Sequence, residues 1–182
     1  MNKKLYPLQF TPIFKYRIWG GNRLRDQLNK TISEDHIGES WEISAVKGDE
    51  TLVANGELKG YSLDQLIQEF QADFLGLSVM ERFGTDFPLL IKFIDAETPL
   101  SIQVHPNDEL AKERHNSFGK NEMWYIMAAD SNAEIIVGFK EQIDREVYRQ
   151  KVVDGAVLSV LNAIPVRKGD VFNIPTGRVH AI

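Results

Sequence analysis

The 182-residue sequence contains no cysteine and only four histidines. A disulfide framework and a thiolate metal site are therefore excluded, and any bound metal must take nitrogen and oxygen ligands. No long apolar run follows the polar start Met1–Lys4, so we expect neither a signal peptide nor a membrane span. A cytoplasmic location is therefore expected. The net charge of -5 disfavours nucleic-acid and membrane partners but leaves room for a local basic pocket.

The composition, 43% hydrophobic and 26% charged, is that of an ordinary globular chain. From Phe87 onward, short apolar stretches alternate with turns and a few helix-like segments, which is typical of a small antiparallel barrel or sandwich. We therefore predict a mainly β protein. Residues 1–86 form an N-terminal arm and a mixed helical and β segment, and residues 87–182 form the barrel portion.

Local patterns predict individual elements within this outline. Alternation over Gly38–Ser44 favours a strand with Glu39 and Trp41 on one face, and Ser62 with Gln65 forms a capping box for a helix. Strands are expected over residues 87–96, 100–106, 122–128, 133–138 and 171–174, and helices over residues 63–72 and 144–153, with another helical turn or two before Gly84.

The stretch Leu100–Pro106 divides cleanly into two faces. Ser101, Gln103 and His105 alternate with an apolar row that is expected to face an outer packing layer, so the polar row would point into a barrel. A lone inward histidine is usually a hydrogen-bonded core residue. The neighbouring glutamine, together with a second histidine from another strand, favours a metal site instead.

Gly169–His180 supplies that second histidine. Its glycine, proline, glycine and histidine spacing, ending Pro175-Thr176-Gly177-Arg178-Val179-His180, predicts a strand, a tight turn and an inward His180. This pattern resembles the second signature of the cupin superfamily, whose small β-barrel holds a metal inside. Gln103-Val104-His105 stands where the first signature has its paired histidines, and that signature alone leaves both Glu109 and Glu122 as candidate carboxylate ligands.

Five blocks occur in order and together resemble type I mannose-6-phosphate isomerase, a zinc-dependent cupin enzyme, over essentially the whole chain. They are Phe14–Gly21, Gly38–Ser44, Phe87–Lys92, Ser101–Pro106 and Gly119–Tyr125. The resemblance implies a cupin-type jelly roll with one zinc ion per chain. It places the metal ligands on Gln103, His105, Glu122 and His180, and so favours Glu122 over Glu109, which lies in a polar helix-like segment.

The resemblance also implies the chemistry. A divalent ion held by two imidazoles, a carboxylate and an amide oxygen can polarise a sugar carbonyl and hydroxyl while a proton moves between adjacent carbons. The expected reaction interconverts mannose 6-phosphate and fructose 6-phosphate, with a general base still to be identified. Lys120 is implied as a catalytic or phosphate-binding residue, and Trp19, Glu42 and Ser101 as substrate contacts. From the residues alone, Trp19 would be a packing anchor, and Glu39, Glu42 and Lys120 would be solvated side chains.

Members of this family continue beyond the position that matches Ile182, with further strands, a second lobe and an arginine-bearing segment. We therefore expect a truncated barrel that binds metal but isomerises poorly, and whose exposed edge pairs with a second copy as a homodimer. A non-catalytic cupin that binds metal and sugar phosphate is the main alternative. An iron cupin oxygenase is disfavoured by Gln103 and by the Lys120-Asn121-Glu122 block.

Overall fold

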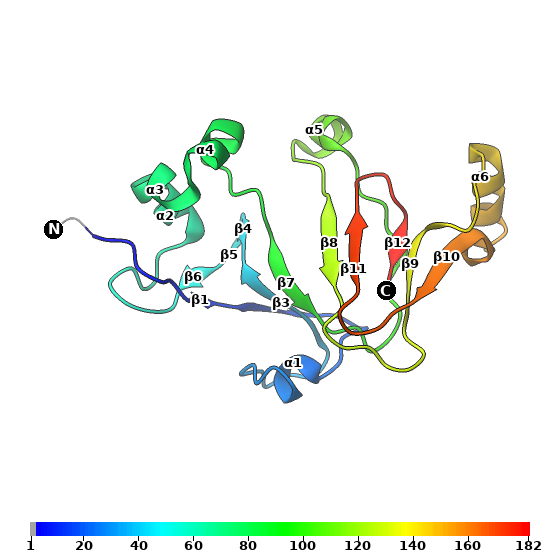
Figure 1. Ribbon diagram of the computed structural model, residues 1–182, viewed down its shortest axis with the longest axis horizontal. Coiled ribbons are helices and arrows are strands. Elements are labelled where there is room, and N and C mark those ends of the chain that lie inside the picture. The colour runs from blue at the N-terminus through cyan, green and yellow to red at the C-terminus, as the bar shows by residue number, and fades with distance from the viewer. Residues whose placement is uncertain (1–2) are drawn as a thin grey trace. The chain divides into compact units, whose positions relative to one another are not determined.

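The computed structural model describes residues 3–182, so the first two residues of the predicted segment 1–86 lie outside it. The chain divides into two compact units, one ending at Thr98 and the other running from Pro99 to Ile182. Both are built mainly from antiparallel strand pairs (Figure 1), which confirms the mainly β class. The division differs from the boundary expected at residues 86 and 87, because β7 (Ile91–Ile94) pairs with β3 (Ile37–Ile43). No helix within residues 3–182 is long and apolar enough to cross a bilayer.

A three-stranded antiparallel sheet organises the first unit, in the order β2 (Ile13–Tyr16), β3, β7. The predicted alternation in β3 is present, since the Trp41 indole Nε1 donates to the Glu39 carboxylate on one face at 2.9 Å. The predicted strand over residues 87–96 shortens to β7, because Pro88 has no backbone N–H for a ladder. The shorter strands here are β1 (Phe10–Thr11), β4 (Ala45–Val46), β5 (Asp49–Glu50) and β6 (Leu52–Val53).

The helices of the first unit follow the predicted capping signal. The Ser62 hydroxyl accepts the Gln65 amide at 3.2 Å, and the Gln65 side chain accepts the Ser62 amide at 3.0 Å. The helix ends at Phe70 rather than at residue 72, because Gln71 takes a φ of 46°. The helices are α1 (Arg23–Asp26), α2 (Leu63–Phe70), α3 (Ala72–Leu75) and α4 (Leu77–Phe83).

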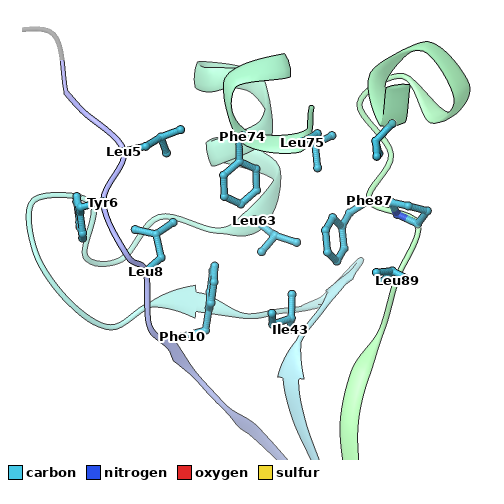
Figure 2. Close-up of a pocket in the computed structure, with 12 residues that line it drawn as sticks. Leu5, Tyr6, Leu8, Phe10, Ile43, Leu63, Phe74, Leu75, Phe87 and Leu89 are labelled. Carbon is cyan, nitrogen blue, oxygen red and sulfur yellow. The ribbon is translucent and has the colours of Figure 1, made fainter. Parts of the chain in front are cut away.

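A cavity of about 540 Å³ lies between the N-terminal segment, the helices and residues 87–89 of the first unit. Figure 2 shows Leu8, Phe10 and Phe74 lining it. The hydroxyl of Tyr6, another lining residue, already donates to the Asn55 carbonyl at 2.7 Å. Because no charged side chain lines the cavity among the described residues, it is unsuited to a phosphorylated sugar.

The second unit contains two small antiparallel sheets. One has the order β10 (Leu161–Pro165), β9 (Glu134–Phe139), β12 (His180–Ala181), and the other pairs β8 (Glu122–Tyr125) with β11 (Val171–Ile174), which run side by side in Figure 1. The predicted helix at residues 144–153 is present, with the Asp144 carboxylate capping the Val147 amide at 2.8 Å. The helical elements are α5 (Asp108–His115), α6 (Arg145–Val153) and the 3₁₀ turn η1 (Val157–Val160).

The segment predicted as a full strand over residues 100–106 is more irregular than expected. Only Gln103 forms a bridge, with His180, because the opposing chain turns at Pro175–Gly177 and leaves few residues to pair. The expectation that the apolar row packs beneath an outer layer is wrong: Ile102 is 36% exposed and Val104 is 52% exposed. Gln103 and His105 are half-buried, so the two faces differ in the predicted sense from residue 102 to residue 105, whereas Ser101 on the predicted inward face is exposed.

Candidate metal centre

Three segments of the second unit bring two imidazoles and one carboxylate together. His105 follows the bridged Gln103, Glu122 begins β8 and His180 begins β12. The Glu122 carboxylate oxygen Oε2 lies 3.2 Å from Nε2 of His180 and 3.5 Å from Nε2 of His105. The candidate ligand atoms of the three residues all lie within 4.8 Å of one another, which is close enough for one ion to bind all three.

The tautomer of His180 is set by the chain itself. Its Nδ1 lies 2.8 Å from the Arg178 carbonyl oxygen, which can only accept, so Nδ1 carries the proton. In the neutral ring, Nε2 then offers a lone pair toward the centre. Within residues 3–182, the buried side-chain nitrogens and oxygens without a hydrogen-bond partner are Nε2 of His105 and Nε2 of His180.

The electrostatics shift the pKa values of His105 and Glu122 in the directions that metal binding requires. Burial lowers the pKa of His105, and the positive charge of Lys120 lowers it further against the opposing effect of Glu122. Burial would raise the pKa of Glu122, but the hydrogen bond and charge of Lys120, with both imidazoles, outweigh it and hold that pKa below its ordinary value. The centre therefore presents a carboxylate and neutral imidazole nitrogen facing one another, an arrangement that a divalent cation stabilises.

The backbone places Gln103 beside this cluster. Gln103 and His180 are directly opposite in an antiparallel bridge, and directly opposed residues of such a pair project to the same face. This common face is what makes Gln103 a candidate for a fourth ligand. Two imidazoles, a carboxylate and an amide oxygen suit zinc, which accepts nitrogen and oxygen donors in tetrahedral sites.

The block that carries Glu122 is fastened to the segment that follows His105. The Lys120 amide donates to the Pro106 carbonyl at 3.2 Å, and the Gly119 amide donates to the Asp108 carboxylate at 2.8 Å. A Cβ on Gly119 would lie 2.6 Å from the backbone of this segment, so only glycine allows this close approach. These contacts link two ligand-bearing segments through the backbone.

The remaining candidates of the second unit lie around this cluster in different ways. The Lys120 ammonium is 3.0 Å from Oε1 of Glu122, the carboxylate oxygen other than the one nearest the imidazoles, and its side chain is 45% exposed. Ser101 is exposed. Glu109, the other carboxylate considered, is exposed in the first turn of α5 and is not part of the cluster. His36, in the first unit, and His115 are exposed, as predicted.

Trp19 and Glu42 belong to the first unit. The Trp19 ring packs against Gly38, where a Cβ would lie 2.5 Å from it, which fits the packing role that residue chemistry alone predicted. The Glu42 carboxylate is bound by Lys30 at 2.7 Å, and so is ion-paired rather than merely solvated. Their roles as substrate contacts stay predictions.

Sequence reasoning missed a buried ionic cluster in the first unit. Glu39 was expected to be solvated but is 6% exposed, and its carboxylate contacts Lys92 at 2.8 Å and Arg17 at 2.8 Å, besides the Trp41 indole. Strand order explains it, because β7 carries Lys92 and Arg17 directly follows β2, and these two strands flank β3. The usable signal was the face that Glu39 shares with Trp41, since an acid beside a large apolar ring is often partly buried.

Comparison with known proteins gives the chain a family. The model for the phosphomannose isomerase type I catalytic domain matches residues 7–148. The chain belongs to the type I phosphomannose isomerases. It is 41% identical over 170 residues to the mannose-6-phosphate isomerase of Streptococcus mutans, covering 91% of this chain and 51% of that protein. It is 40% identical over 177 residues to ManA of Bacillus subtilis, covering 97% and 54%.

A solved mannose 6-phosphate isomerase has the same fold. The crystal structure of the Bacillus subtilis mannose 6-phosphate isomerase superposes with a TM-score of 0.88 at 38% identity, covering 97% of this chain and 55% of that one. This confirms the predicted cupin architecture. The chain spans about half the length of the curated relatives it matches.

Proposed function

We propose that this chain binds one zinc ion through Gln103, His105, Glu122 and His180, and interconverts mannose 6-phosphate and fructose 6-phosphate. The observation that carries the proposal is the pair of buried Nε2 atoms that face the Glu122 carboxylate without hydrogen-bond partners within the described residues. Buried polar atoms nearly always have a partner, and one shared cation would be a partner for both Nε2 atoms and for the Glu122 carboxylate. The family, and the names of its relatives, support the substrate.

The residues of the site have different proposed roles. When bound, zinc supplies a Lewis acid that polarises the sugar oxygens. The Arg178 carbonyl holds the proton on Nδ1 of His180, so this imidazole keeps its lone pair for the centre. Lys120, half-exposed at the rim beside Glu122, is placed to bind an anionic group of the substrate while it also orients the carboxylate.

Zinc content and turnover test the proposal directly. The purified chain is expected to bind close to one zinc ion, measured by metal analysis and by competition with a chromophoric chelator. H180A and E122Q are expected to weaken zinc affinity by far more than ~10–100-fold, which is the usual loss when a residue that only supports a ligand is replaced. H115A is the matched control, because His115 is exposed and outside the cluster.

A coupled assay for fructose 6-phosphate, run on the zinc-loaded chain, measures the reaction. Turnover that disappears in E122Q and persists in H115A supports the isomerase. Zinc and sugar-phosphate binding without turnover supports the non-catalytic alternative. Failure of the chain to bind zinc contradicts both.

Homodimerisation is the proposed assembly. Within the second unit, β8 and β11 pair only with each other, and three apolar side chains are exposed on their outward face beside the polar Asn173: Met123 is 66% exposed, Tyr125 55% and Val171 60%. Pairing of two copies through this face would remove it from water. Sedimentation equilibrium is expected to show a dimer that Y125K weakens, whereas a monomer at high concentration contradicts the proposal. The cytoplasmic location stays a prediction.

A further inference from the structure

Asn121 links two parts of the chain that carry candidate metal ligands. Its side-chain oxygen Oδ1 accepts a hydrogen bond from the Thr176 amide at 3.0 Å, across 55 residues of sequence. Asn121 immediately precedes Glu122, and Thr176 lies in the turn that leads from β11 to His180.

The reason for this bond lies in the ladder between β8 and β11. The register pairs Ile174 with Glu122, so the next pair would place Pro175 opposite Asn121. Proline has no amide N–H, and the ladder cannot continue through it. The Asn121 side chain takes over at this point by accepting the amide of Thr176, the residue after the proline.

The following amide fastens the same turn to another candidate ligand. The Gly177 N–H donates to the carbonyl of His105 at 2.8 Å, so consecutive amides of the turn bond to the neighbour of Glu122 and to His105 itself. Three residues later the chain presents His180. The turn therefore helps to set the direction of the His180 imidazole, together with the backbone pairing of His180 with Gln103 and with Val137 of β9.

We propose that Asn121 is a positioning residue for the metal centre: its side chain fixes the Pro175–Gly177 turn so that His180 meets His105 and Glu122 at one point. The proposal rests on the proposed metal site. Asn121 itself is exposed and lies outside the cluster, on the opposite strand face from Glu122. It acts through the backbone of the turn and does not contact the ion.

The test compares zinc affinities of variants of the 182-residue chain by chelator competition. N121L removes the acceptor at nearly constant size and is expected to weaken zinc binding by about 10-fold or more, as other supporting residues of metal sites do. N121D keeps an acceptor oxygen at the same place and is expected to restore the affinity. Repeating N121D in high salt separates hydrogen bonding from the attraction of its added charge.

N55L is the matched control. Asn55 also ties distant backbone segments together, accepting the Gln9 amide at 2.9 Å and donating to the Pro7 carbonyl at 3.1 Å, but it lies in the first unit. N55L is expected to lower the thermal midpoint while leaving zinc affinity unchanged.

Three results overturn the proposal: N121L binding zinc as tightly as the wild type, N121D failing to restore affinity in high salt, or N55L weakening zinc binding as much as N121L. Absence of zinc binding by the wild-type chain is a separate result. It overturns the proposed metal site itself, and with it any positioning role for Asn121.

Discussion

Gln103 and His180 are locked opposite each other by two backbone hydrogen bonds, with N···O distances of 2.8 and 2.9 Å in the two directions. The Leu100 amide and the Ile182 carbonyl extend the same alignment at 2.7 Å. The backbone, rather than any side-chain contact, therefore decides which residue stands beside His180. Predictions about the candidate centre can be made from this alignment.

Replacing Gln103 is expected to change zinc affinity in a direction set by the donor atom that the new side chain supplies. Q103L removes the amide oxygen and should weaken zinc binding, whereas Q103E supplies a carboxylate and should strengthen it. V104A serves as the control, because Val104 lies on the exposed face of the same segment. Equal zinc affinity of Q103L and the wild type, measured by chelator competition, would remove Gln103 from the ligand set.

Replacing Lys120 is expected to separate metal binding from substrate binding. The Lys120 ammonium lies 3.0 Å from Glu122 and repels a cation at the same carboxylate, so K120M should bind zinc at least as tightly as the wild type. The same variant should bind mannose 6-phosphate more weakly in calorimetry of the zinc-loaded chain. K112M, on the exposed face of α5, is the control, and a K120M variant that binds the sugar phosphate normally contradicts the phosphate role.

The buried Glu39 should make the chain sensitive to acid. Burial raises its pKa, but Lys92, Trp41 and Arg17 outweigh this and hold the pKa below the ordinary value of 4.5. The native state therefore gains stability above about pH 4.5 and loses it as the pH falls through the lower folded value. Urea unfolding at a series of pH values should show this loss in the wild type.

E39Q should flatten that acid dependence. At pH 7 the E39Q change should also lower the free energy of unfolding by about 1–3 kcal/mol. The mostly buried Lys92 ammonium would then face a neutral amide in place of a carboxylate. E109Q, at an exposed position, should leave the whole pH profile unchanged. An E39Q profile as steep as that of the wild type would show that other carboxyl groups cause the acid loss.

Two leucines of α2 should differ in the cost of truncation. Leu66 is fully buried in the hydrophobic core of the first unit, whereas Leu63 borders the 540 Å³ cavity. L66A should cost about 3–5 kcal/mol of unfolding free energy and L63A about 2–3 kcal/mol, because Leu63 already has fewer neighbours on one side. Equal costs in urea denaturation would indicate that the cavity is filled in solution.

Local elements could be predicted because their causes lie within a few residues. Ser62 and Gln65 cap each other, Asp144 caps α6, and the strand at Val171–Ile174 ends at a proline. The errors occurred where distant chain segments decide the outcome. Nothing near residues 100–106 in the sequence shows that their partner segment turns away after a few residues.

The candidate centre was predictable as a set of residues but not as a geometry. The motif spacing points to His105 and His180, and the family resemblance adds Glu122; the structure brings the three together. The Asn121 contact to Thr176 and the burial of Glu39 both depend on strand register, which pairs residues far apart in sequence. A sequence pattern shows which side chains share a face of a strand, and the strand register determines which side chains of the neighbouring strands they contact.

The order of the ligand-bearing segments also has a consequence for folding. Between Gln103 and His180 the chain forms α5, β8, β9, α6, β10 and β11, so the candidate centre is assembled from contacts of long sequence separation. Such contacts require large loops to close and form late. Rapid zinc uptake during refolding should therefore appear only after most of the second unit has folded, which would make zinc binding a kinetic marker of completed assembly.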